Sequence, residues 1–236
     1  MKSVLTENSK ALPIGYGIFR PSLLAINPEL MLRVHGYRNT EKLRPAIRAA
    51  AEAIATLTER LIAPQVHYRR VGVRALTGGE LVLEDGVTFH NEAFPRLLGE
   101  SREVVIAIAT MGPALDQEVI ARMDRFEPLE ALFLETGGWL GIESVSKQFG
   151  DYLRALSRGH GYRVSCRMGP GYNYKVDGCE SQWPLEEQRQ VFQAFDGIEL
   201  PVRLLDSCAM LPKMSRTGLY GLTPPGRGAI VISKSE

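Results

Sequence analysis

The sequence predicts an α+β fold in which a mixed or antiparallel sheet packs against a long central helix. A continuous apolar run at Val104–Ala109, bounded by charges and by Thr110-Met111-Gly112, is typical of a central strand. From Pro128 to about Ser157, apolar residues lie nearly all round a helical pattern, which indicates an interior helix. Alternating apolar residues between Val66 and His90 predict a small antiparallel meander. Together these segments favour the α+β class.

The chain before the meander divides into two parts. Three prolines break residues 1–39, which predicts an N-terminal arm or small helices. Apolar residues then recur every three or four positions from Thr40 to about Ala63, with charges between them, which predicts an amphipathic helix. Thr40 is a suitable N-cap, and Pro64 ends the pattern. In this interpretation residues 40–223 form one domain, and 224–236 form a C-terminal tail.

The remaining elements follow from turn residues and apolar runs. Tight-turn dipeptides, Gly78-Gly79 and Asp85-Gly86, separate the predicted meander strands, which are Val66–Leu76, Leu81–Glu84 and Val87–His90. Helices are predicted at Phe94–Leu98, from Pro113 to about Arg125, and at Pro184–Phe195. Further strands are predicted at Val202–Leu205, Cys208–Leu211 and Gly218–Leu222.

Glycines interrupt the long helical pattern at Gly137, Gly138, Gly141 and Gly150. Each costs about 1 kcal/mol of helix propensity relative to alanine, so something must come close to the helix to offset that cost. Two explanations stay open: tight packing of another backbone, or a ligand that lies against the helix.

Composition excludes several classes of protein. The 236 residues are 44% hydrophobic and 23% charged, as in a globular chain, and the formal net charge is +1. Such a balance provides no field to attract nucleic acid or an acidic membrane. No apolar run approaches the roughly 20 residues of a membrane helix, and the N-terminus does not resemble a secretory signal. We therefore expect a soluble cytoplasmic protein with no nucleic-acid or membrane partner.

Motifs for common cofactors are also missing. Three widely spaced cysteines and four scattered histidines do not form a zinc or other metal pattern, so no metal site is predicted. Dinucleotide-binding, phosphate-binding and serine-hydrolase motifs are absent.

Two segments carry functional chemistry. Arg167 to Tyr172 sets a guanidinium at a strand end beside two glycines and a proline, a turn that lets backbone amides approach a ligand. An arginine can bind the carboxylate of a ligand through two parallel hydrogen bonds. The alternative is that an arginine in this position forms an ordinary surface ion pair. Met210 to Tyr220 places a proline, a lysine and two hydroxyls between apolar stretches, which predicts a loop between strands.

These segments belong to an ordered set of motifs. Its members are Arg-x-x-Pro-Gly-Tyr at 167–172, Trp-Pro-Leu-x-x-Gln at 183–188, Asp-Ser-Cys-Ala-Met at 206–210, and Met-x-Pro-x-x-Ser-x-x-Gly at 210–218. The set resembles the reactivation domain of cobalamin-dependent methionine synthase, and the chain is closer in size to stand-alone relatives of that domain. The resemblance extends upstream through Gly141-Ile142-Glu143-Ser144 and covers roughly His35 to Leu222. It implies an activation-domain-like fold for residues 40–223.

The resemblance also implies a function. A protein of this family binds S-adenosylmethionine and presents it to a corrinoid, cobalamin, that another protein module holds. When the corrinoid is oxidised to cob(II), one-electron reduction coupled to methyl transfer restores it as methylcob(III). The expected partners are a corrinoid-binding methyltransferase protein, which must supply the cobalamin because this chain shows no module for it, and a flavodoxin- or ferredoxin-type electron donor.

The resemblance assigns roles to individual residues. Arg167 matches the arginine that holds the donor's carboxylate. Tyr172 matches a tyrosine that faces the corrin ring near the cobalt, and it is the one residue assigned a catalytic role. From the residues alone, Tyr172 is equally a half-buried turn aromatic, and Glu143 is equally a paired core carboxylate. The residues assigned to the S-adenosylmethionine site are Glu143, Arg167, Met168, Gly169, Gly171 and Tyr220. Of these, Met168 and Gly169 lie where backbone groups of the family contact the adenine.

Two departures leave other functions open. His35-Gly36-Tyr37-Arg38 has no carboxylate where the family has an aspartate for the donor's amino group, and Asn173 to Glu180 forms a longer, more polar insertion than we expect. These features favour a non-catalytic adaptor or chaperone for a corrinoid protein. A further alternative is a subunit of a multi-protein methionine synthase.

Overall fold

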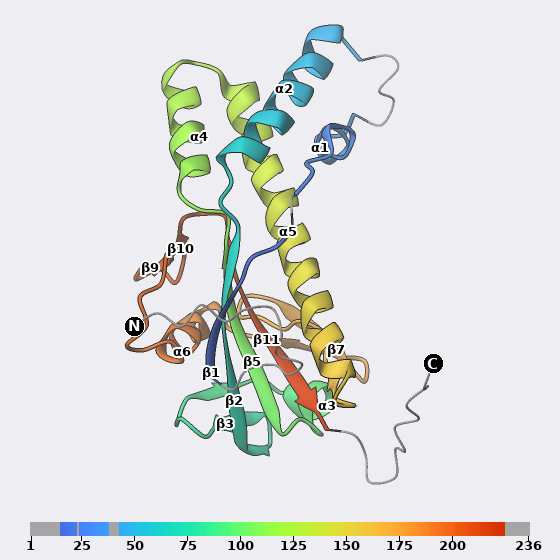
Figure 1. The fold of residues 1–236 in the computed structure, drawn as a ribbon, viewed down its shortest axis with the longest axis vertical. Coiled ribbons are helices and arrows are strands. Elements are labelled where there is room, and N and C mark those ends of the chain that lie inside the picture. Colours follow the sequence, from blue (N-terminus) through green and yellow to red (C-terminus); the bar gives the residue numbers. More distant parts are fainter. Residues whose placement is uncertain (1–14, 23, 38–42, 225–236) are drawn as a thin grey trace.

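A curled antiparallel sheet and one long helix organise the molecule (Figure 1). The computed structural model describes residues 15–22, 24–37 and 43–224. Within these ranges, seven strands form the main sheet in the order β4-β3-β2-β5-β11-β6, and β1 pairs beside β2. The strands of this sheet are β1 (Gly15–Phe19), β2 (Gln65–Thr77), β3 (Glu80–Leu83), β4 (Thr88–His90), β5 (Glu103–Thr110), β6 (Arg163–Val164) and β11 (Ser215–Thr223).

The other elements surround this sheet. Two small hairpins are formed by β7 (Asn173–Val176) with β8 (Cys179–Gln182) and by β9 (Arg203–Leu204) with β10 (Met210–Leu211). The helices are α1 (Pro28–Val34), α2 (Pro45–Leu61), α3 (Phe94–Leu98), α4 (Ala114–Asp124), α5 (Pro128–Arg158), the 3-10 turn η2 (Leu185–Glu187) and α6 (Gln188–Gln193). No helix in the described ranges has the length and apolar composition needed to cross a membrane.

The helix α5 spans two layers of the molecule. Its 31 residues extend about 46 Å at 1.5 Å per residue, longer than the sheet beside it. Its C-terminal half packs on one face of β2, β5 and β11, where Phe149 and Val145 meet Tyr68 and Tyr220. Its N-terminal half continues beyond the sheet and forms a separate helical cluster with α1, α2 and α4 (Figure 1). One helix thus joins both parts of the core.

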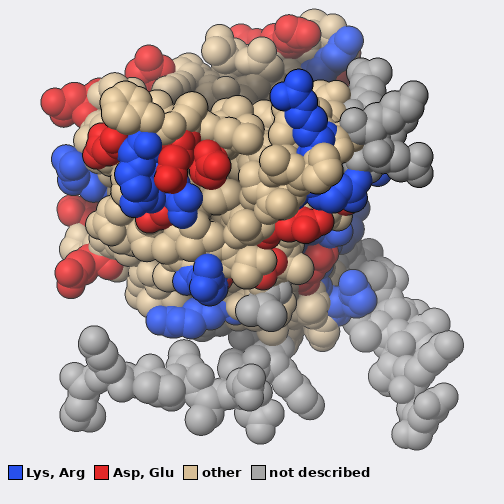
Figure 2. All heavy atoms as spheres, turned by 90° about the horizontal axis from the view of Figure 1, so that it is seen from above, with Lys and Arg blue, Asp and Glu red and all other residues tan. Residues whose placement is uncertain are grey.

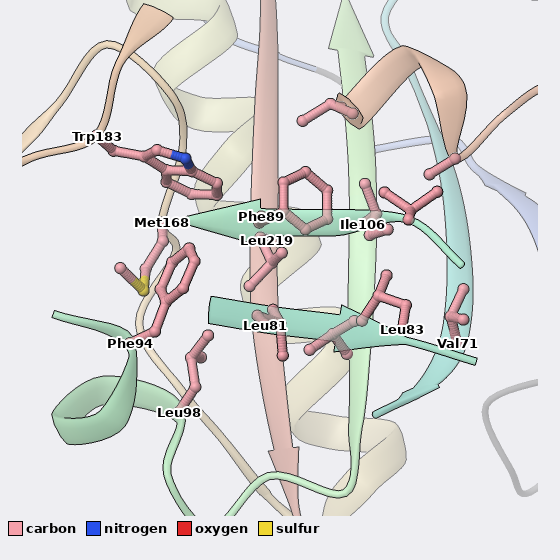
Figure 3. Close-up of a cluster of buried hydrophobic side chains, with 14 of the residues drawn as sticks. Val71, Leu81, Leu83, Phe89, Phe94, Leu98, Ile106, Met168, Trp183 and Leu219 are labelled. Atoms are coloured by element: carbon pink, nitrogen blue, oxygen red, sulfur yellow. The ribbon is translucent and has the colours of Figure 1, made fainter. Parts of the chain in front are cut away.

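The opposite face of the sheet carries its own core. The strands β3 and β4 cross over β5 and β11 here, as Figure 3 shows. Trp183 is fully buried and meets Phe89 and Phe94 edge to face, with ring centroids 5.8 and 5.0 Å apart. Met168 and Leu219 also belong to this cluster. The core on this face therefore includes the segments on both sides of the Arg167–Tyr172 turn.

The predicted fold class is confirmed: the protein is α+β, with an antiparallel sheet packed against a long central helix. The central strand is β5, which lies between β2 and β11. The predicted meander is β2-β3-β4, and the helices at 94–98 and 113–125 are α3 and α4. The helix predicted from Thr40 begins at Pro45, and Thr40 itself lies outside the described residues.

Two local predictions were wrong in part. The loop predicted over Met210–Tyr220 is shorter, because β11 begins at Ser215 and includes the strand predicted at Gly218–Leu222. The helix predicted at 184–195 begins with a 3-10 turn before α6. The polar insertion at 173–180 forms most of a hairpin, β7-β8, whose turn at Asp177 and Gly178 adopts positive φ at both positions.

Within residues 1–39, α1 is a small helix of the predicted kind, whereas β1 extends the sheet as a strand. The boundary between the first two predicted domains stays a prediction.

Three of the four glycines of α5 lie against side chains of neighbouring elements. A Cβ on Gly137 would lie 2.7 Å from Thr58 Oγ1, and one on Gly138 would lie 2.3 Å from Leu115 Cδ2. At Gly141 the same atom would lie 2.4 Å from Met111 Cε. These partners are side chains of α2, of α4 and of the residue that follows β5, so the predicted tight packing is present but involves side chains instead of another backbone.

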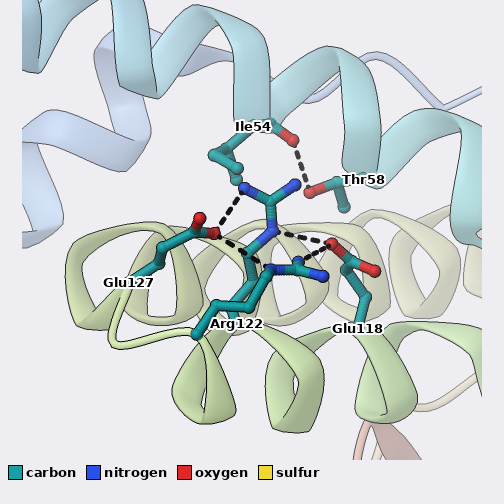
Figure 4. A network of polar contacts seen from close by, with 6 residues as sticks. Ile54, Thr58, Glu118, Arg122 and Glu127 are labelled. Atoms are coloured by element: carbon teal, nitrogen blue, oxygen red, sulfur yellow. Dashed lines mark hydrogen bonds and ion pairs between the residues drawn. The ribbon is translucent and has the colours of Figure 1, made fainter.

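Ion pairs link α4 to the start of α5 at the end of the helical layer that lies away from the sheet. Arg122 donates to Glu118 at 2.6 Å and to Glu127 at 3.0 Å, and Arg125 also contacts both carboxylates (Figure 4). Figure 2 shows acidic and basic side chains interspersed on the end of the molecule at which α2 and α4 lie. The hydrogen bond from Arg122 lowers the pKa of Glu118. Its carboxylate therefore stabilises the folded state when ionised.

We predict that Glu118→Gln lowers the melting temperature by about 2 °C at pH 7. A lowered folded-state pKa adds stability above the unfolded value of about 4.5, and that contribution is lost as the pH falls through the folded value. The difference between wild type and variant should therefore become smaller as the pH falls from 7 to 3. Thermal denaturation from pH 3 to 7 measures it.

The matched control is Glu52→Gln, because Glu52 lies on the exposed face of α2 and its carboxylate has no ion pair within the described part of the chain. An effect of Glu118→Gln that is equal at pH 3 and pH 7 would contradict an electrostatic origin.

Candidate functional site

The segment that leads into the Arg167–Tyr172 turn lies along the outer edge of β11. Ser165 N donates to Gly221 O at 2.9 Å, beyond the short pairing of β6. Met168 and Leu219 exchange two backbone hydrogen bonds, of 2.9 and 2.7 Å. These bonds continue the sheet by one irregular strand. They fix where the Arg167 backbone lies relative to β11.

The far side of the turn is held by Trp183. Gly171 N donates to Trp183 O at 2.7 Å, and Trp183 N donates to Tyr172 O at 2.9 Å. The indole of Trp183 is buried in the core of Figure 3, and its Nε1 donates to Glu187 Oε2 at 2.7 Å. Gly171 has φ +87°, a conformation that glycine adopts without strain. A buried anchor therefore presents the exposed ring of Tyr172.

Arg167 lies across β11 rather than pointing into solvent. A Cβ on Gly218 would come within 3.1 Å of Arg167 Cγ, so this glycine makes room for the side chain. The guanidinium donates from Nη1 to Thr217 O at 2.8 Å and stacks over the Tyr172 ring, 4.8 Å from its centroid. The cation is half-buried and held on two sides. It remains at the surface of the sheet, not in the core.

An acidic group from α5 faces this cation. Glu143 Oε1 and Arg216 Nη2 are 2.5 Å apart, and they join α5 to β11. The hydrogen bond from Arg216 lowers the pKa of Glu143, and the charge of Arg167 lowers it further. Two guanidiniums and one carboxylate thus share one small region.

Tyr220 forms the floor of this region. Its ring meets Phe149 edge to face at 5.6 Å, on the side of the sheet that α5 covers. Burial raises the pKa of the Tyr220 phenol to about 12. Arg167, Arg216 and Tyr220 also line a hollow of about 10 Å³. That volume holds about one water molecule, so a larger ligand would lie over the mouth of the hollow.

The fold therefore brings four predicted site residues together from three segments of the chain, which are α5, the Arg167–Tyr172 turn and β11: Glu143, Arg167, Tyr172 and Tyr220. The charged groups suit the amino-acid end of a ligand, because a guanidinium pairs with an α-carboxylate and a carboxylate pairs with an α-ammonium. The exposed Tyr172 ring offers an aromatic surface beside them. Among the described residues, no cluster of three or more His, Cys, Asp or Glu side chains could hold a metal ion.

The predicted adenine-contacting groups have partners within the chain. Both backbone groups of Met168 bond to Leu219, and its side chain is fully buried. Gly169 N donates to the Tyr174 hydroxyl at 2.7 Å, and that hydroxyl approaches Gly169 O at 3.0 Å. Contact between Gly169 and a ligand would require Tyr174 to release it. The adenine-binding role of these residues stays a prediction.

His35 and Tyr37 come from the stretch that lacks the expected aspartate, and they pack near the N-terminal half of α5. His35 Nε2 is 2.7 Å from Thr136 Oγ1, and Tyr37 packs in the helical cluster. Thr136 precedes Glu143 by seven residues, or about two helical turns. In the described structure, the contacts of His35 and Tyr37 therefore lie away from the Glu143 pair.

Sequence reasoning missed three residues near the site. Arg216 occupies a variable position of its motif, but its alternation with Gly218 and Tyr220 on one strand face was a usable signal. Tyr174 lies in a hairpin that the Asp-Gly dipeptide could have revealed. Trp139 is exposed one helical turn before Glu143.

Comparison with known proteins identifies the fold that carries this site. No protein-family model and no curated protein sequence matches the chain. Among solved structures, it is similar to the MetH reactivation domain bound to AdoHcy, with a TM-score of 0.58 and 14% sequence identity. The similarity covers 91% of this chain and 80% of the other. The chain therefore has the fold of that reactivation domain, and the resemblance predicted from the motifs is confirmed for the fold.

We predict that Tyr174→Phe lowers the free energy of unfolding by about 1 to 2 kcal/mol, because the buried Gly169 amide loses its acceptor. Urea denaturation measures the loss, and hydrogen exchange should show faster exchange at the Gly169 amide. Tyr172→Phe is the control, since the Tyr172 hydroxyl has no hydrogen bond within the part of the chain that is described. Equal losses in the two variants would contradict the assigned contact.

Proposed function

We propose that this protein binds S-adenosylmethionine and supports the reductive methylation of a corrinoid carried by a partner protein. The observation that carries the proposal is the convergence of Glu143, Arg167, Tyr172 and Tyr220 on one side of the sheet, in a domain with the fold of a reactivation domain. AdoHcy, which the similar structure binds, is what remains of S-adenosylmethionine after it gives up its methyl group. The fold and the charges of the site both fit such a ligand.

Each side chain has a separate task in this proposal. Arg167 binds the α-carboxylate of the ligand, since its guanidinium is half-buried and already oriented by Thr217 O and the Tyr172 ring. Glu143 faces the α-ammonium. Tyr220 forms the buried floor beneath the ligand.

The exposed Tyr172 ring provides the surface that meets the partner's corrinoid, because Trp183 fixes its turn from behind. When bound, S-adenosylmethionine supplies the methyl group, and the corrinoid, after a one-electron reduction, accepts it. The protein's own contribution is to position the two reactants. The corrinoid-binding protein and an electron donor of flavodoxin or ferredoxin type are the proposed partners.

We expect Arg167→Ala to weaken binding of S-adenosylmethionine by about 2 to 4 kcal/mol, because a partly buried charged hydrogen bond is lost. Isothermal titration calorimetry measures the affinity. Arg163→Ala is the control: Arg163 is exposed and pairs with Glu100 at the other end of the same segment, so its loss should leave the affinity unchanged. Equal affinity of wild type and Arg167→Ala would reject the role of Arg167.

The proposed activity has a direct test. The protein is mixed with a cobalamin-binding domain of methionine synthase loaded with cob(II)alamin, S-adenosylmethionine and reduced flavodoxin. We expect the methylcobalamin absorbance to appear only when this protein is present. We expect Tyr172→Ala to slow its appearance even when S-adenosylmethionine is saturating, so that any weaker donor binding caused by loss of the ring beside Arg167 does not account for the effect. Donor binding without cobalt methylation would reject the activity but not the binding site.

A second candidate function is a non-catalytic adaptor for a corrinoid protein. It is favoured by the Tyr174 hydroxyl, which already bonds to Gly169, and by the small volume of the hollow beside Tyr220. An adaptor would bind the cobalamin-loaded domain without binding S-adenosylmethionine. The titration and the absorbance experiment together distinguish the two functions.

A further inference from the structure

The charge of the candidate site is not balanced. Arg167 and Arg216 contribute two positive charges and Glu143 contributes one negative charge, a formal excess of +1. Arg154 also lies near Tyr220, but it pairs with Asp151 at 2.8 Å and adds little net charge. The immediate surroundings of the hollow are therefore cationic.

Arg216 is the fixed member of its ion pair. Its side chain is 12% exposed, whereas that of Glu143 is 46% exposed. Its backbone is paired with Ala109 in the centre of the sheet, and it projects from the same face of β11 as Gly218 and Tyr220. Glu143 can swing toward solvent or toward a ligand, but the position of Arg216 on β11 keeps its charge beside the hollow.

The pair also limits what Glu143 offers to a ligand. Arg216 occupies Oε1 of the carboxylate at 2.5 Å, so an ammonium group that approaches Glu143 shares it with a guanidinium. Any second positive charge on the ligand meets the field of both arginines, and within the described residues no further carboxylate pairs with either of them. A compact, partly dehydrated site makes this repulsion stronger than it would be in water.

We propose that Arg216 is a specificity-determining residue that makes this site prefer a nucleoside amino acid of zero net charge over one that carries a sulfonium. This inference rests on the proposed function. At neutral pH, S-adenosylmethionine has a carboxylate, an ammonium and a sulfonium, and its net charge is +1. S-adenosylhomocysteine has only the first two and is neutral overall.

This preference has a consequence for the reaction cycle. Methyl transfer removes the sulfonium charge, so the ligand fits the site's charge better after transfer than before it. The demethylated product therefore binds more tightly than the donor. The same site can bind the product when the methylated donor is scarce.

The test compares two ligands on three proteins by calorimetry. For the wild type we expect S-adenosylhomocysteine to bind about 5-fold more tightly than S-adenosylmethionine at low salt. Arg216→Gln keeps a polar side chain without the charge, and the ratio should fall to about 1 or reverse as Glu143 is released. Arg216→Lys keeps the charge and should keep the preference. In 0.5 M salt the wild-type ratio should shrink.

Glu143→Gln provides a variant on the other side of the pair. Removal of the carboxylate that pairs with Arg216 should increase the preference for the neutral ligand. Thermal denaturation verifies that each variant is folded. Folded Arg216→Gln protein with an unchanged ratio, while both ligands bind, would overturn this inference and leave the proposed function standing. If the wild type binds neither ligand, the proposed function fails and this inference fails with it.

Discussion

The close approach of α5 to the elements around it is the constraint on which this structure depends. Glycines at 137, 138 and 141 leave no Cβ between the helix and its neighbours, and Ala107 and Ala109 are the small residues of β5 on the face toward α5. The helix pays about 1 kcal/mol for each glycine, and burial against the sheet and the helical layer offsets that cost. Without this approach, an acidic side chain of α5 could not reach a strand of the sheet.

The candidate site lies where α5 packs on the sheet. Glu143 reaches from α5 to Arg216, and Arg167 reaches toward this contact over the edge of β11, where Gly218 leaves room. The opposite charges are pre-positioned, so a zwitterionic ligand would find them in place. The excess of guanidiniums is equally a consequence of the fold, because β11 presents one of them and the segment along its edge presents the other.

The turn that carries Tyr172 is stabilised from three directions. Backbone pairing to Leu219 holds one end, the buried Trp183 holds the other, and the Tyr174 hydroxyl bonds to Gly169 between them. A turn so constrained can present an exposed aromatic ring without a large entropic cost on binding. The same hydrogen bonds also pair the backbone groups of the turn within the chain, so a ligand would have to displace these partners to bind the same groups.

The sequence by itself determined the class of fold, the central strand, the meander and the long helix, because each has a hydrophobic period or a turn dipeptide that depends on local residues alone. It also marked Arg167, Tyr172 and Glu143 through their motifs. Only the tertiary structure decided the start of β11 at Ser215, the partner of Glu143 and the hydrogen bond from Gly169 to Tyr174. These depend on contacts between residues far apart in the chain, and no local period encodes which side chains meet when a helix packs on a sheet.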